Sequence, residues 1–190
     1  MIVTVTLNTG LDHTLFMDKL QLGYTQKVRA STISMAGKPA DASWVLSTLG
    51  IPNLATGFAA GELGKKMEAM LRARGAQTDF LWVGGETRLN TVIIVDGDSQ
   101  QTTLTTETLQ ITPGDIAAFH EKLAGLLNGA GAMIIGGSAP RKVGPEVYRD
   151  LVALAAARGM LPSRSVCGVS PTCSSPTAEC LPRRSHAPVA

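Results

Sequence analysis

Four polar positions in this chain are candidates for binding chemistry: Asp12, Gly37–Lys38, Arg88 and Ser138. Asp12 and Ser138 each follow an apolar run that is typical of a buried strand, and open α/β sheets bind their ligands at the ends of such strands. Arg88 carries a planar guanidinium that can hold a phosphate through two parallel hydrogen bonds. The Gly-Lys pair precedes Pro39, which suits the first turn of a helix.

Each position also has a plainer explanation. Asp12 fits an ordinary turn or cap, and Gly37–Lys38 fits a helix entrance that binds nothing. A lone arginine on a strand is usually a solvated charge, and Gly-Gly-Ser before a proline is also a common turn. Taken one at a time, these residues leave both explanations open.

Two familiar phosphate-binding loops are excluded by spacing. A P-loop needs a glycine five residues before its Gly-Lys and a serine or threonine after it, and neither Gly37-Lys38 nor Gly64-Lys65 has them. The Gly-x-Gly-x-x-Gly turn of dinucleotide-binding proteins is absent as well.

Strand-like and helix-like patterns alternate through residues 1–160. Strands are expected near 2–8, 53–58 and 132–137, and amphipathic helices near 42–49, 63–71, 116–126 and 147–154. In the first helix, the apolar stripe comprises Ala42, Val45, Leu46 and Leu49. The alternation predicts an α/β fold with a mostly parallel sheet and helices on both faces. The less apolar strands near 14–34 and 88–106 break the alternation and predict a smaller, separate sheet.

Five stretches in this order are more specific together than any is alone. They read VTLNTGLD, AGKPADASWVLSTLG, TGFAAGELG, GETRLN and IGGSAPRKVGPEVYRDLVALAAARG. As an ensemble they resemble the N-terminal half of the PfkB, or ribokinase-like, carbohydrate kinases, with 1-phosphofructokinases and tagatose-6-phosphate kinases as the nearest branch. The resemblance covers about residues 1–160. It implies a ribokinase-like α/β fold with a small β lid.

The resemblance also implies ATP-dependent phosphoryl transfer to a hydroxyl of a sugar phosphate, with ATP and Mg²⁺ as cofactors. Asp12 would hold sugar hydroxyls, Gly37–Lys38 would approach the sugar, and Ser138 would lie in the turn beside it. Lys27 and Arg88 would hold the phosphate already on the substrate. The implied substrate-binding set is Asp12, Lys27, Gly37, Lys38, Asp41, Arg88, Asn90 and Ser138. A homodimer contact through the lid is a further implication.

Two departures from the family pattern limit the transfer of function. Asp41 stands where the pattern Gly-Gly-Lys-Gly-x-Asn has its asparagine, and an ionised carboxylate only accepts hydrogen bonds, so the preferred sugar is expected to differ. No Gly-Ala-Gly-Asp anion hole with its catalytic aspartate, and no nucleotide site, is found after residue 160. The expectation is a truncated and inactive kinase chain with no catalytic residue of its own. The alternatives are a non-catalytic module that binds a sugar phosphate or dimerises, and the product of a decaying gene.

Residues 161–190 differ in composition from the rest. They contain half of the ten prolines and all three cysteines, without strand or helix periodicity. Two explanations stand side by side: a disordered tail, or a reading-frame shift at the point where the βαβ pattern requires another strand. The cysteines are spaced by six and seven residues, which is not a zinc pattern, so no metal site is expected.

The overall charge and hydropathy of the chain indicate which classes of binding partner to expect. The formal net charge is +2 and the basic residues are not clustered, so nucleic-acid binding is not expected. No apolar run approaches the ~18 residues of a membrane-spanning helix. The first ten residues are typical of a strand and not of a signal peptide. A cytoplasmic protein with a small-molecule sugar or sugar-phosphate ligand is expected.

Overall fold

The computed structural model describes residues 1–97, 101–160 and 163–165, the last three as backbone only. The segment predicted to be a disordered or frame-shifted tail, 161–190, therefore lies outside the described residues except for 163–165. Within the described part of the chain, no helix is long and apolar enough to cross a membrane.

A parallel sheet forms the centre of the molecule. Its central strand β1 (Ile2–Thr6) pairs with β4 (Asn53–Ala59) on one side and β11 (Ala132–Gly136) on the other. β12 (Ser163–Ser165) pairs with β11, whereas β5 (Gln77–Thr78) and β6 (Leu81–Trp82) pair with β4. Every one of these pairings is parallel, as expected from the alternation of strands and helices.

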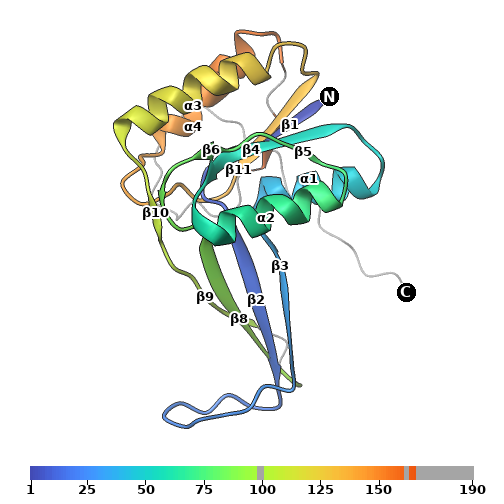
Figure 1. The fold of residues 1–190 in the computed structure, drawn as a ribbon, viewed down its shortest axis with the longest axis vertical. Coiled ribbons are helices and arrows are strands. Elements are labelled where there is room, and N and C mark those ends of the chain that lie inside the picture. Colours follow the sequence, from blue (N-terminus) through green and yellow to red (C-terminus); the bar gives the residue numbers. More distant parts are fainter. Residues whose placement is uncertain (98–100, 161–162, 166–190) are drawn as a thin grey trace, which may run out of the picture.

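Helices cover both faces of this sheet (Figure 1). Helices α3 (Pro113–Leu126) and α4 (Glu146–Ala156) lie on one face, and α1 (Lys38–Thr48) and α2 (Gly61–Ala73) on the other. The face beneath α3 and α4 holds the larger core cluster, in which the rings of Phe58 and Phe119 lie 5.0 Å apart. The smaller cluster packs Met67 and Leu71 of α2 against Leu11. The two clusters together fix the sheet between its helices.

A second, smaller sheet is present, as the less apolar strands near 14–34 and 88–106 predicted, and we refer to it as the lid. Its strand order is β3-β2-β8-β9, and it extends away from the layered body (Figure 1). The bounds are β2 (Gly10–Met17), β3 (Ala30–Ala36), β8 (Arg88–Val95) and β9 (Gln101–Leu104). β2 pairs antiparallel with β3 and parallel with β8. A short antiparallel ribbon of β7 (Gly84–Gly85) and β10 (Leu109–Gln110) lies outside both sheets.

The predicted helices are present, but α1 buries a different face from the one its apolar stripe indicated. Val45 and Leu49 are 54% and 67% exposed, whereas Pro39, Ala40 and Ser43 are buried. The buried face consists of small residues because α1 packs close against the sheet, and the Ser43 hydroxyl donates a hydrogen bond to Asn53 on β4. The prediction of an apolar contact stripe in this helix was wrong for that reason.

Candidate functional site

The site forms where the lid joins the parallel sheet. β2 starts four residues after β1 ends, and β8 runs beside β2 in parallel register. That register places Asp12 directly beside Asn90. The buried Asn90 side chain, 5% exposed, donates from Nδ2 to Asp12 Oδ1 at 2.7 Å. Two of the predicted site residues are therefore directly bonded.

Arg88 joins this pair through Thr105. Arg88 Nη1 donates to Thr105 Oγ1 at 2.9 Å, and Thr105 Oγ1 in turn donates to Asn90 Oδ1 at 2.8 Å. Arg88 Nε is buried and has no hydrogen-bond partner among the described residues. Because a buried N–H without a partner costs free energy, this donor is poised for an acceptor that a ligand could bring. Nothing in the sequence pattern pointed to Thr105, which lies in the segment after β9.

The charge of Arg88 is only partly compensated. Burial lowers the pKa of Arg88, while the carboxylates of Asp12 and Glu107 act in the opposite direction. The guanidinium remains charged in proteins at any ordinary pH. Gly10, paired with Arg88 across β2 and β8, leaves room for its stem, because a Cβ at Gly10 would lie 2.8 Å from Arg88 Cγ.

The start of α1 lies against the same junction. Gly37 is the N-cap at φ 107°, and a Cβ there would lie 2.9 Å from Thr6 Cγ2 at the end of β1. Only glycine suits both the dihedral angle and the space. Lys38, the first residue of α1, is exposed. The Gly-Lys pair thus forms the closely packed start of α1, directly after the lid strand β3.

Asp41 lies in the first turn of α1, and the Asp12 carboxylate contributes to a raised pKa of its side chain. Partial burial first, and Asp12 second, raise the pKa of Asp41 to about 6, although the residue retains contact with solvent. A carboxyl group with this pKa is partly protonated near neutral pH, and its protonated form donates as well as accepts. The expectation that Asp41 only accepts hydrogen bonds therefore holds only for its ionised form.

Ser138 lies across the end of β1, in the turn after β11. The buried Asn8 donates from Nδ2 to Ser138 Oγ at 3.0 Å. The Tyr148 hydroxyl donates to the Ser138 carbonyl oxygen at 2.9 Å, and burial raises the pKa of Tyr148 to about 12. These two bonds fix the turn. The sequence analysis did not identify Asn8. Its position directly after a buried strand, where ligand-binding residues are often found, could have indicated it.

Lys27 does not join the cluster within one chain. It is exposed in the connection between β2 and β3, beyond the last pair of that ladder, Phe16 with Ala30. At ~3.3 Å per residue, even Phe16 is ~13 Å along the strand from Asp12. The structure thus brings together Asp12, Asn90 and Arg88, sets Gly37, Asp41 and Ser138 around the junction, and leaves Lys27 at the outer end of the lid.

Among the described residues, no group of three or more His, Cys, Asp or Glu side chains could hold a metal ion. At the start of α1, Pro39 has no N–H to donate, and Asp41 would place a carboxylate beside any phosphate. The helix entrance consequently differs from a triphosphate-binding loop.

Known proteins resemble this chain in both sequence and fold. No family model matches the chain. A 1-phosphofructokinase of Vibrio cholerae is 30% identical over 145 residues, covering 76% of this chain and 45% of that protein. A tagatose-6-phosphate kinase of Staphylococcus epidermidis is 29% identical over 161 residues, covering 85% and 51%. The chain spans about half the length of the curated relatives it matches.

The solved structures agree with these relatives. A protein of Thermotoga maritima described as a possible 1-phosphofructokinase superposes with a TM-score of 0.79 at 32% identity, over 85% of this chain and 52% of that one. Escherichia coli phosphofructokinase-2 in complex with fructose-6-phosphate has a TM-score of 0.78 over 88% of this chain and 55% of that one; at 20% identity it shows the fold alone. The chain is a homologue of sugar-phosphate kinases with a ribokinase-like α/β fold, as the sequence motifs predicted.

Proposed function

We propose that this chain binds a hexose phosphate at the Asp12–Asn90–Arg88 cluster, as the acceptor-binding part of a sugar-phosphate kinase. The observation that carries the proposal is the buried Arg88 Nε, which has no partner among the described residues and adjoins a hydrogen-bonded Asp-Asn pair. A guanidinium suits a phosphate, and a carboxylate held by an amide suits sugar hydroxyls. The homologues named above act on phosphorylated sugars by name, which supports the same ligand class.

Each side chain has a distinct role in this proposal. Asp12 accepts hydrogen bonds from sugar hydroxyls, while Asn90 fixes the orientation of its carboxylate. Arg88 donates to the substrate phosphate. Asp41 contacts the sugar near Asp12, and its protonation state influences which hydroxyls are accepted. Ser138, held by Asn8, borders the sugar on the side of the parallel sheet.

Lys27 requires a change of geometry to reach the same phosphate. Either the lid bends toward the parallel sheet or the lid of a second copy supplies the lysine. The homodimer through the lid, expected from the sequence, is proposed on this basis.

Phosphoryl transfer by this polypeptide alone is not part of the proposal. When ATP and Mg²⁺ are bound in a kinase, they supply the transferred phosphoryl group and neutralise its charge. At the start of α1, Pro39 has no N–H to donate and Asp41 carries a carboxylate, so we propose that this helix entrance does not hold the nucleotide phosphates. We infer that the 190-residue chain binds the acceptor without transferring phosphate. This function is that of the non-catalytic sugar-phosphate-binding module, which the sequence offered as an alternative. We also propose a cytoplasmic location, from the sequence.

Calorimetric titration tests the binding proposal. Fructose 1-phosphate and tagatose 6-phosphate are titrated into the parent chain, Arg88→Ala and the control Arg149→Ala, whose side chain is 78% exposed. A hydrogen bond to a charged group contributes ~1.5–3 kcal/mol, so Arg88→Ala should weaken binding about 10- to 150-fold. The control should bind as the parent does. Equal affinity of Arg88→Ala and the parent would remove Arg88 from the site.

A further inference from the structure

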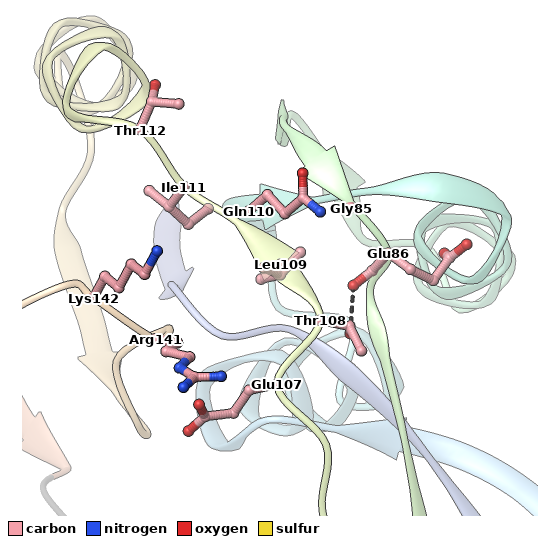
Figure 2. A pocket seen from close by; sticks show the side chains of 10 residues that line it. All are labelled: Gly85, Glu86, Glu107, Thr108, Leu109, Gln110, Ile111, Thr112, Arg141 and Lys142. Atoms are coloured by element: carbon pink, nitrogen blue, oxygen red, sulfur yellow. Dashed lines mark hydrogen bonds between the residues drawn. The ribbon is translucent and has the colours of Figure 1, made fainter.

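A cavity lies near the candidate site and shares none of its residues. Its volume is about 830 Å³, within the range of small-ligand sites. The cavity is lined by Gly85, Glu86, residues 107–112, Arg141 and Lys142. One wall is the segment that contains β10, and the other is the turn after β11 (Figure 2). We refer to it as the β10 pocket.

The charges that face the β10 pocket are mainly positive. The side chains of Arg141 and Lys142 extend from consecutive positions of the turn toward the opposite wall (Figure 2). The Glu86 side chain points away from the pocket, and its Oε1 accepts a hydrogen bond from the Leu63 N–H at 2.9 Å. Glu107, beside Arg141 in Figure 2, is the carboxylate that remains. Two cations thus face one anion.

The backbone at Lys142 is held in an unfavourable conformation. Lys142 has φ 66°, and it is the single non-glycine residue with a positive φ in the described part of the chain. Such a conformation costs of order 1–3 kcal/mol for a residue other than glycine, and it persists where surrounding structure imposes it, often at ligand sites. The side chain of this strained residue lines the pocket. A glycine here would relieve the strain and lose the ammonium group.

We propose that the β10 pocket binds a phosphorylated small molecule, whose phosphate contacts the Arg141 guanidinium and the Lys142 ammonium. Within the described residues, neither side chain has a hydrogen bond or an ion pair to satisfy it. Leu109 and Ile111 give the pocket an apolar wall for the remainder of the ligand. Glu107, which lies beside Arg141 in Figure 2, also acts electrostatically on Arg88 of the candidate site.

Titration with inorganic phosphate at constant ionic strength tests this proposal independently of the acceptor site. The background is Arg88→Ala, in which phosphate binding at the acceptor site is weakened. In that background we expect one remaining binding event, weakened about tenfold or more by Lys142→Gly, since one charge-assisted hydrogen bond is lost. Lys66→Ala removes one exposed charge on α2 that does not line the pocket, and it should leave the affinity unchanged.

The stability of the same variants separates a ligand role from a structural one. Lys142→Gly should melt at the parent temperature or above, because glycine accepts the positive φ without strain. Lys142→Asn, which also tolerates this conformation, provides a second variant that keeps a side chain. Loss of phosphate binding in both variants without loss of stability supports the proposal. No binding event in the Arg88→Ala background, or one that is unaffected by both Lys142 substitutions, would overturn it.

Discussion

Asn90 is the residue through which the candidate site can be tested by stability alone. Its buried amide donates to Asp12 at 2.7 Å and accepts from Thr105 at 2.8 Å, so Asn90→Leu removes both bonds at similar volume. A hydrogen bond to a charged group contributes ~1.5–3 kcal/mol and a neutral one ~0.5–1.5 kcal/mol. Since Asp12 and Thr105 retain access to water, we expect a loss of about 2–3 kcal/mol in the free energy of unfolding.

Urea unfolding at neutral pH measures this loss, with Thr91→Val as the matched control on the opposite side of the same strand. The Thr91 hydroxyl has no hydrogen bond of this kind, so the control should stay within ~0.5 kcal/mol of the parent. Asn90→Asp adds a second carboxylate beside Asp12, and its destabilisation should shrink as the pH falls and the pair takes up a proton. If Asn90→Leu unfolds within ~0.5 kcal/mol of the parent, the Asp12–Asn90–Thr105 chain of bonds contributes nothing and the reasoning fails.

Two other predictions concern pH dependence and backbone packing. The pKa of Asp41 is raised in the folded state from 3.8 to about 6, so its ionised form opposes folding above that pH and this penalty disappears as the pH falls. Asp41→Asn should therefore raise the melting temperature at about pH 7.5 and much less at about pH 4; an equal gain at both would contradict the raised pKa of Asp41. Gly57→Ala should cost more than about 3 kcal/mol, because φ is 145° and its Cβ would lie 1.8 Å from the carbonyl oxygen of Thr6. Gly125→Ala, in α3 with nothing within 4 Å, should stabilise by about 0.5–1 kcal/mol in the same thermal melts; a similar result for both glycines would refute the packing argument.

The sequence predicted the layers of this fold because strand and helix periods report burial directly. The failure at α1 shows the limit of that signal. Val45 and Leu49 have helical spacing, but the helix approaches the sheet through Ala40 and Ser43, whose small size carries little hydrophobic signal. Where a helix lies close against a sheet, dense packing leaves room only for small residues at the contact. The amphipathic pattern therefore identified helix α1 but not the face that it buries.

The candidate site was predicted in part for a similar reason. Asp12, Arg88 and Asn90 stood in motifs with a family resemblance, and the structure places them together. Thr105 and Asn8 complete the hydrogen-bond connections from distant segments, and a single threonine or asparagine is too common to be noticed by spacing. The strain at Lys142 is a backbone property that only coordinates reveal.

The central claim is that a hexose phosphate binds where the lid meets the parallel sheet. It is tested most directly by titrating the ¹⁵N-labelled chain with fructose 1-phosphate and following the backbone amide resonances. We predict that the shifts concentrate at residues 10–12, 36–41, 88–90 and around Thr105, and that Arg88→Ala largely abolishes them. Shifts centred elsewhere, or none at saturating sugar phosphate, would contradict the assignment of this junction as the acceptor site.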